Sequence, residues 1–259
     1  MKYKVLLGTS FGVALLGSLA AHMPASWAWQ QVPDIRGLDV TGVDGTLWRG
    51  SASQLTWQGK NFGRLQWQVK LGSLFTGKLA LDVRFGQGSS MGMTGRGVVG
   101  YGFAGPFAQN LLVSAPAQEA MKFAPPGIPV KLAGNLELTL RDYRYAAPYC
   151  ESLDGSLVWS GANISSPLGG LAPGPVIAGL GCENGKLNAK VTQSSDDVSS
   201  DFDLALAPDK GYTFKGWFKP QANFPPQLGK QLGWVTQSFS WVNGPDPKGQ
   251  YKVAGSGRL

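Results

Sequence analysis

Apolar and polar residues alternate with a period of two along much of the chain. From Arg64 to Leu71 the side chains at positions 65, 67, 69 and 71 are apolar, and the three between them are polar. Successive side chains of a β-strand point to opposite faces, so this pattern puts the apolar groups on one face. The alternation recurs over 79–85, 136–140 and 202–206. It predicts half-buried strands of an antiparallel sheet.

A second pattern appears when the chain is aligned with itself at a shift of about 110 positions. Asp44-Gly45-Thr46-Leu47-Trp48 returns, with one inserted residue, as Asp154-Gly155-Ser156-Leu157-Val158-Trp159. Three later landmarks keep the same order in both copies: 77–83 with 185–191, 100–105 with 211–216, and 131–134 with 252–255. Short helices beside Pro-rich turns are expected at matching places, over 117–124 and 227–232.

This repeat predicts the domain organisation. We expect two copies of one β unit, over residues 36–141 and 142–259, each with an apolar face that buries against itself or the other copy. The predicted fold is therefore all-β, with an N-terminal transmembrane helix followed by an elongated, curved or folded-over antiparallel sheet built from two repeated units.

The N-terminal residues indicate export. Lys2 and Lys4 precede an uncharged stretch, and no further charged residue occurs before Asp34. A helix from Val5 to Trp29 would be about 37 Å long, which is enough to cross a bilayer core of about 30 Å. We expect residues 1–29 to form a cytoplasmic tail and a retained anchor.

Two tryptophans, Trp27 and Trp29, would lie at the far membrane interface, with everything from about residue 30 onward outside the cytoplasm. The sequences at 18–20 and 26–28 have the small-x-small form that a signal peptidase needs. Cleavage of the segment as a signal peptide is therefore the alternative to a retained anchor.

Composition supports a β protein beside a membrane. The chain has 37 Gly, 17 Pro and nine Trp, and only 15% of its residues are charged, which favours short strands and tight turns over a helical bundle. The formal net charge is +7, yet Lys and Arg occur singly. We interpret this as a solvated basic surface near anionic lipid, and we expect no nucleic-acid partner.

The two cysteines, Cys150 and Cys182, are expected to pair. The chain has one His and no C-x-x-C, so its Cys and His cannot assemble a zinc site. In an oxidising compartment two thiols usually form a disulfide, and closing a loop of about thirty residues would stabilise the fold by about 3–4 kcal/mol. Two free buried thiols are the alternative.

Several motifs resemble catalytic or binding sites, but their surroundings do not fit. The G-x-S-x-G at 8–12 lies inside the membrane segment, and the only His, His22, has no carboxylate nearby. The G-x-G-x-x-G matches at 95–100 and 100–105 are not followed by a helical pattern, so a nucleotide site is not expected. The acidic residues Asp196, Asp197, Asp201 and Asp203 are expected on a solvated surface and not at a metal site.

Five tryptophans are expected mainly in the core, because most occupy alternating strand positions: Trp57, Trp67, Trp159, Trp217 and Trp241. No catalytic residue, cofactor, metal or small-molecule substrate is therefore predicted.

Much of the chain resembles a known family. The segment Pro24-Ala25-Ser26-Trp27 leaving the membrane, Gly37-Leu38, residues 42–50, Ile128-Pro129-Val130 and the cysteine-flanked second copy look like the type II secretion system protein N family. The resemblance implies a non-enzymatic accessory component in the bacterial inner membrane. It would have a single pass and its C-terminal bulk in the periplasm, and would assist export of folded proteins through contacts with other secretion components.

The same segments are more distantly similar to the AsmA and TamB group of anchored β proteins with a lipid-lining groove. This implies the alternative function, lipid binding or transfer at the inner membrane with phospholipid as partner. An interaction scaffold should bury its apolar faces, whereas a lipid carrier should keep an apolar groove open. For the scaffold, we expect free strand edges near Lys70 and Lys252 to pair with a partner. A hydrolase ranks last, since no nucleophile and base are found.

Overall fold

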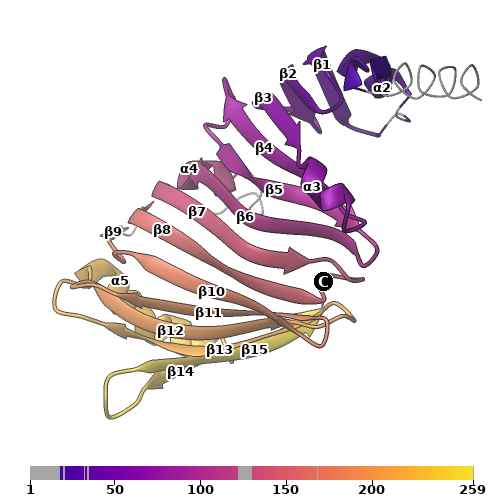
Figure 1. Cartoon of the computed structure of the whole chain (residues 1–259). Coiled ribbons are helices and arrows are strands. Elements are labelled where there is room, and N and C mark those ends of the chain that lie inside the picture. Colours follow the sequence, from indigo (N-terminus) through magenta and orange to yellow (C-terminus); the bar gives the residue numbers. More distant parts are fainter. Residues whose placement is uncertain are drawn as a thin grey trace, which may run out of the picture. The chain divides into compact units, whose positions relative to one another are not determined.

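The structure, a computed structural model, describes residues 18, 19, 21–31, 33, 35–121, 130–167 and 169–258 (Figure 1). The described strands form antiparallel pairs, which confirms the all-β prediction. The chain divides into two compact units, residues 1–96 and 97–259, and strand β5 (Thr94–Gly102) contains the boundary. We describe each unit by itself. The proposed repeat boundary near residue 141 stays a prediction.

The described part of unit 1 is a meander of neighbouring antiparallel strands, with the short helices α2 and α3 beside it. The hydrogen-bonded order is β1-β2-β3-β4, so each strand pairs with the next along the chain. Its elements are α2 (Ala25–Gln30), β1 (Leu38–Gly45), β2 (Arg49–Trp57), β3 (Lys60–Val69), α3 (Leu71–Leu74) and β4 (Leu79–Gln87).

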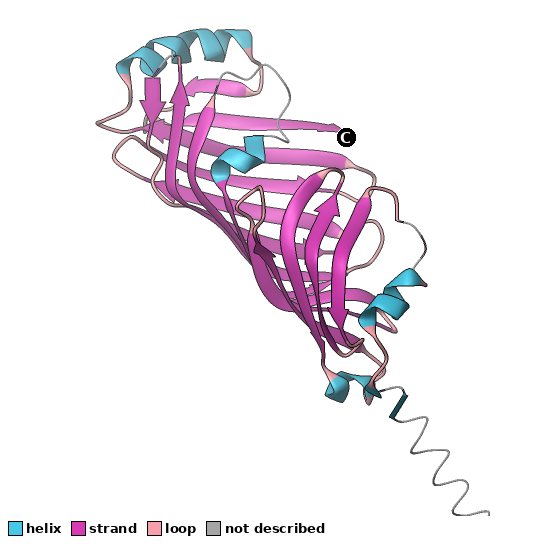
Figure 2. Ribbon diagram, turned by 90° about the horizontal axis from the view of Figure 1, so that it is seen from above, coloured by secondary structure: helices cyan, strands magenta, loops and turns pink. Residues whose placement is uncertain are grey.

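Unit 2 is a larger sheet in the order β6-β7-β8-β10-β11-β12-β13-β15-β14, with β9 paired to β8. Its elements are β6 (Gly105–Pro116), α4 (Ala117–Ala120), β7 (Lys131–Arg144), β8 (Ser152–Ser166), β9 (Gly169–Leu171), β10 (Val176–Glu183), β11 (Lys186–Ser194), β12 (Val198–Leu206), β13 (Gly211–Pro220), α5 (Pro226–Ser238), β14 (Val242–Pro245) and β15 (Tyr251–Arg258). Helix α5 lies at the ends of the strands (Figure 2) and contacts β14. Helices are thus found near both predicted positions, and α5 is longer than expected.

The strand register converts the alternation of the sequence into two chemically different faces. In unit 1, Trp67 lies opposite Gly50 on one side and Val83 on the other. In unit 2 one apolar row crosses eight strands, because each of its members is the register partner of the next. The row is Val113, Leu138, Leu157, Ala178, Val191, Phe202, Gly216 and Val253.

Aromatic rings cover glycines on the neighbouring strand of this apolar face. A Cβ at Gly255 would lie 2.5 Å from Cζ of Phe214, and one at Gly216 would lie 2.5 Å from Cδ1 of Phe202. The pairs Trp67 with Gly50, Phe85 with Gly95, and Tyr212 with Gly257 follow the same rule. Each ring lies over a position without a side chain, so part of its area is removed from water within a single layer.

The apolar faces are incompletely buried. Fifteen hydrophobic residues are buried in the described part of the chain, and none of them is a Leu, Ile, Phe or Trp. The larger side chains of the long apolar row, such as Leu138 and Phe202, are half-buried. The prediction that the tryptophans lie in the core is only partly right: Trp67, Trp159 and Trp217 are half-buried, whereas Trp57 and Trp241 are exposed.

The predicted membrane anchor falls mostly outside the described residues, as do Lys2 and Lys4. No helix in the described ranges combines the length and the apolar character needed to cross a membrane. Within those ranges Trp27 and Trp29 belong to α2, and Trp27 is exposed. The transmembrane helix therefore stays a prediction.

Two details of the sequence interpretation were wrong. Leu71 does not continue strand β3 but begins α3, where its side chain is exposed. Neither Lys70 nor Lys252 lies on an edge strand, since Lys70 follows the inner strand β3 and Lys252 belongs to β15 between β13 and β14. Local alternation carries no information about which strand ends a sheet.

Candidate functional site

The free side of β1 is a strand edge that lies next to helix α2. Among the described strands, β1 pairs only with β2, and it is eight residues long with no proline. An edge strand of this length presents unpaired backbone N–H and C=O groups to another chain. This side of β1 is therefore a candidate site for a partner strand.

The other edge strands of the described chain, β9 and β14, are short. Strand β14 has four residues, ends at Pro245, and changes register against β15 between Val242 and Pro245. Short length, proline and irregular pairing all discourage further strand addition. Edge pairing is thus better supported at β1 than at β14.

A groove of about 280 Å³ runs beside β1. It is lined by Trp29 and Gln30 of α2, by Pro33 and Ile35, and by the first residues of β1. Helix α2 is held near the sheet through its preceding residues, because Pro24 forms a β-bridge with Thr46 and the N–H of Leu47 donates to the Met23 carbonyl at 3.0 Å. A partner strand on β1 would have a half-apolar groove available for one of its side chains.

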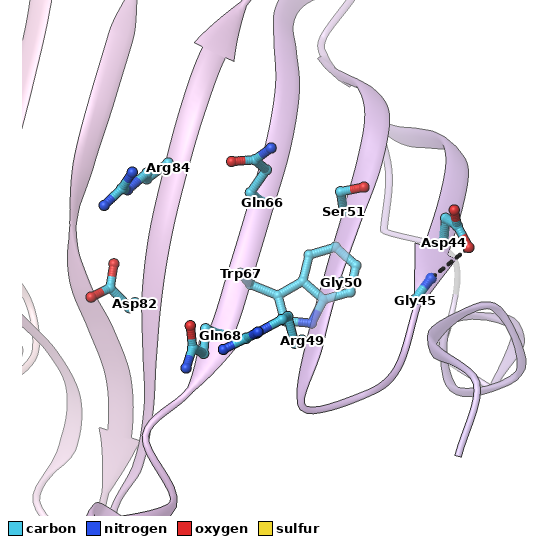
Figure 3. Close-up of a pocket in the computed structure, with 10 residues that line it drawn as sticks. All are labelled: Asp44, Gly45, Arg49, Gly50, Ser51, Gln66, Trp67, Gln68, Asp82 and Arg84. Atoms are coloured by element: carbon cyan, nitrogen blue, oxygen red, sulfur yellow. Dashed lines mark hydrogen bonds between the residues drawn. The ribbon is translucent and has the colours of Figure 1, made fainter. Parts of the chain in front are cut away.

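A polar groove of about 530 Å³ lies on unit 1, over β1 to β4 (Figure 3). The register builds it from two cross-strand rows of mainly exposed side chains. One row is Asp44, Ser51, Gln66 and Arg84, and the other is Arg49, Gln68 and Asp82. The amide groups and the charges of both signs in this groove suit recognition of a polar chain. The residues that line it do not form a nucleophile–base pair.

The first copy of the repeated motif forms the turn beside this groove. Gly45 has φ of +88°, a conformation that favours glycine, and its N–H is bonded to Asp44 Oδ1 at 2.7 Å. The N–H of Thr46 donates to the Arg49 carbonyl at 2.8 Å, which closes the hairpin of β1 and β2. Trp67 Nε1 donates to the Leu47 carbonyl at 3.1 Å. These bonds, with Trp48 in the same turn, fix the hairpin that presents β1.

The second copy of the motif has a different local structure. Asp154, Gly155, Ser156, Leu157 and Trp159 all lie within the long strand β8, paired to β7 and β10. The sequence repeat therefore does not give two identical turns. Motif residues serve as a turn in the first copy and as strand in the second.

Asp154 binds Arg141 across β7 and β8. Arg141 Nε donates to Oδ2 at 2.7 Å and a terminal nitrogen donates to Oδ1 at 2.5 Å, a two-pronged geometry. The hydrogen bond from Arg141 is the main reason that the pKa of Asp154 lies below its ordinary value, and the nearby positive charge adds to it. The pKa of Arg141 is raised for the same reasons. This pair is a structural contact on the exposed surface.

The disulfide prediction is confirmed. Cys150 lies just before β8 and Cys182 lies in the neighbouring strand β10, with their Cα atoms 6.3 Å apart and no free cysteine in the described chain. The bond joins strands that already pair, because Asp154 and Gly181 are register partners nearby. It therefore fixes the start of β8 within unit 2.

A second polar groove, of about 590 Å³, lies on unit 2 over β10 to β13. Asp203 lies between Lys190 and Lys215 in the register and forms an ion pair with Lys215 at 3.7 Å. Asp197 instead accepts a hydrogen bond from the backbone N–H of Ala172 at 2.7 Å. The acidic residues thus serve surface and turn contacts, and the described residues contain no group of acidic, His or Cys side chains suited to a metal.

The remaining motifs do not come together as a catalytic site. The G-x-S-x-G at 8–12 lies outside the described residues. His22 Nδ1 lies 2.9 Å from the Ser18 carbonyl. The glycine-rich stretch 95–105 forms β5, a turn and the start of β6, with no helix following it.

Sequence reasoning missed the grooves. The polar residues at alternating positions of β3 were visible, but their partners on β2 and β4 depend on the register. The groove at β1 depends on the return of α2 to the sheet. Neither can be obtained from local periodicity.

Comparison with known proteins gives a consistent result. The sequence model of the family described as type II secretion system (T2SS), protein N, matches residues 36–254. The chain is 41% identical to type II secretion system protein N of Vibrio cholerae serotype O1 over 259 residues, and 32% identical to that of Aeromonas hydrophila over 262 residues. Both alignments cover 100% of each chain. A relative from Pectobacterium carotovorum is 29% identical over 88% of this chain and 91% of its own length. No solved structure matches the chain.

Proposed function

Because the chain belongs to the type II secretion system protein N family, we propose that it is a non-enzymatic accessory of that secretion system. It would assist export of folded proteins from the periplasm through contacts with other components of the machine. We further propose that it is held at the inner membrane by a single N-terminal helix, with the sheet on the periplasmic side. The family match over 36–254 is the observation that carries this function.

The contact would be made at the β1 edge. Strand addition uses main-chain hydrogen bonds, so it demands little of the partner's sequence, while a flanking groove selects one side chain. The edge of β1 is long enough for several such bonds, and the groove of α2 and β1 adjoins it. Polar rows beside β1 would then contact the rest of the partner chain.

Crosslinking in intact cells tests this proposal. A photo-reactive residue at Thr41, which is exposed on β1, should capture other secretion components. The matched control is a photo-reactive residue at Thr192, which is exposed on the inner strand β11, lines neither polar groove, and should capture them far less. Equal capture at both positions would contradict the edge mechanism, and no capture together with full secretion in a deletion strain would remove the function.

Blocking the edge should reduce secretion. The change Thr41→Lys places a charge that discourages strand addition, whereas Thr192→Lys adds the same charge to an inner strand away from the polar grooves. We expect loss of exported protein in the culture medium for Thr41→Lys alone, at equal levels of both variants in the cell. Unchanged secretion with Thr41→Lys would count against the edge.

One observation favours a second candidate function, lipid binding by unit 2. Its apolar face crosses eight strands, yet the large side chains on it are only half-buried, and Leu204 in the adjacent row is 42% exposed. An open apolar face is what a lipid carrier requires. Mass spectrometry of lipids that co-purify with the protein tests it, and reproducible phospholipid that is lost in Leu204→Asp would support it. Absence of bound lipid would leave protein contact as the function.

A further inference from the structure

An exposed aromatic cluster lies where α5 leads into β14. We define it as Trp234, Phe239 and Trp241, which are 60%, 38% and 43% exposed. Ring centroids are 5.8 Å apart for Trp234 and Phe239, and 5.3 Å apart for Phe239 and Trp241. Trp241 also meets Phe214 of the apolar face edge-on, at 6.3 Å. The three rings thus form one continuous surface patch.

The C-terminal segment that contains the aromatic cluster is strongly basic. Residues 210–259 contain seven Lys or Arg and one acidic residue, a formal charge of +6, so the other 209 residues supply only +1 of the total of +7. In the described part of this segment the ion pairs to acidic side chains are Lys215 with Asp203 and Lys252 with Asp246. Most of the positive charge is therefore left without a carboxylate.

Helix α5 turns a basic and aromatic stripe outward. Lys230, Trp234 and Gln237 are spaced four and three residues apart, so they share one side of the helix, and all three are exposed. Leu228, Leu232 and Val235 are half-buried on the other side. The helix contains no acidic residue. Exposed Trp side chains are enriched where proteins meet the membrane interface, and Lys side chains there are attracted to anionic lipid.

We propose that the aromatic cluster rests on the surface of an anionic phospholipid bilayer. The indole rings of Trp234 and Trp241 would enter the headgroup region, where a ring can be buried while its N–H stays hydrated. Basic side chains around them would be attracted to lipid phosphates. This contact adjoins the open apolar face through Trp241 and Phe214 but is separate from the β1 edge, so it stands or falls independently of the protein contact proposed at β1.

A fluorescent probe beside the aromatic cluster tests this contact in the full chain. Both native cysteines are in the disulfide, so Gln237→Cys offers a single thiol for an environment-sensitive dye. Thr192→Cys on β11 is the matched control, because it is exposed on the face opposite to Phe202 and Phe214. The protein is mixed with vesicles of phosphatidylethanolamine and phosphatidylglycerol, and with vesicles of phosphatidylcholine alone.

We expect the dye at 237 to shift to shorter wavelength and to be quenched by brominated acyl chains in the phosphatidylglycerol vesicles. The dye at 192 should do neither. High salt should weaken the effect, because it screens exposed charges. The change Lys230→Ala should lower the affinity of the protein for the phosphatidylglycerol vesicles about fivefold. The change Trp234→Gln should largely abolish quenching. Circular dichroism confirms that each variant is folded.

The proposal is wrong if the dye at 237 remains in water with phosphatidylglycerol vesicles, or if it responds equally to phosphatidylcholine and to high salt. A dye that is silent on vesicles but becomes buried when other secretion components are added would make the cluster a protein interface and also overturn the proposal. None of these results depends on crosslinking at β1, so failure here is distinguishable from failure of the proposed function.

Discussion

The side chain of Gln193 holds two segments of unit 2 together through hydrogen bonds. Gln193 is the one buried polar residue of the described chain, at 8% exposure. Its Nε2 donates to the carbonyls of Val198, at 2.6 Å, and of Pro173, and its Oε1 accepts from Ser200 Oγ at 2.9 Å. One amide thus ties the turn of β11 and β12 to the segment before β10.

Removing this amide should be costly. We expect Gln193→Ala to destabilise the protein by about 2 kcal/mol, because the carbonyls of Pro173 and Val198 lose a donor in a site that water enters poorly. Urea unfolding followed by circular dichroism measures this. The control Gln109→Ala removes an exposed amide from β6 and should change stability by less than about 0.5 kcal/mol. Equal effects of the two changes would contradict the role of Gln193.

The Arg141–Asp154 pair should make stability depend on pH. Because the folded pKa of Asp154 is lowered, its carboxylate contributes stability above the unfolded pKa of about 3.9, and the contribution is lost as pH falls through the folded value. Asp154→Asn should therefore be less stable than the parent near neutral pH and equal to it at about pH 2. Urea unfolding of both proteins across this range checks the sign, and a difference that grows in acid would refute it.

At the scale of elements, the sheet is stabilised by contacts between neighbouring strands. Aromatic rings lie over glycines of the neighbouring strand. A disulfide joins the segment before β8 to β10, and the turn at 46–48 closes the β1–β2 hairpin. These contacts all lie within one layer. They compensate for the missing deep burial of Leu, Ile, Phe and Trp in the described strands.

The ring-over-glycine contacts predict a sharp difference between two strand glycines. A Cβ at Gly216 would collide with the Asp201 carbonyl and the Phe202 ring, whereas a Cβ at Gly181 meets nothing within 4 Å. We expect Gly216→Ala to cost about 1–3 kcal/mol and Gly181→Ala to be neutral or slightly stabilising. Thermal unfolding of the two variants measures both effects, and an equal Tm for the two variants would contradict the predicted collision at Gly216.

Loss of the disulfide should weaken unit 2. The two cysteines are 32 positions apart, so replacing both by Ala should lower the free energy of unfolding by about 3–4 kcal/mol. The parent protein under reducing conditions should match the double variant. Urea midpoints with and without reductant test this, and no change on reduction would mean that packing alone holds the start of β8.

At the scale of the whole molecule, the described residues offer several chemically different surfaces. Unit 1 offers the β1 edge and a polar groove, and unit 2 offers a partly open apolar face and a basic segment with an aromatic cluster. These surfaces are the basis of the protein and lipid contacts that we propose.

The open apolar face of unit 2 should bind an apolar fluorescent dye in the native state. Leu204→Gln should reduce this binding, because Leu204 is exposed on the same face as Phe214. Thr213→Gln changes the opposite face of the adjacent strand and should leave it unaltered. Fluorescence of 8-anilinonaphthalene sulfonate below the unfolding transition measures the effect, and no native-state binding would mean that the face is closed in solution.

Sequence by itself determined the properties that are local or that involve few partners. Period-two alternation identified β3, β4, β7 and β12 and their apolar faces, because side-chain direction in a strand depends only on position parity. The disulfide followed from there being only two cysteines. The motifs at 42–50 and around the cysteines indicated the family that the comparisons then showed.

Only the tertiary structure decided which strands end a sheet, which glycines lie beneath rings, and which aromatics gather outside. The motif at 44–48 became a turn while its copy at 154–159 became the middle of a strand, since pairing on both sides of β8 overrides local similarity. Lys70 and Lys252 were misplaced on edges for the same reason. Pairing and register join residues far apart in the chain, so their free energy is a property of the assembled sheet and has no local signature.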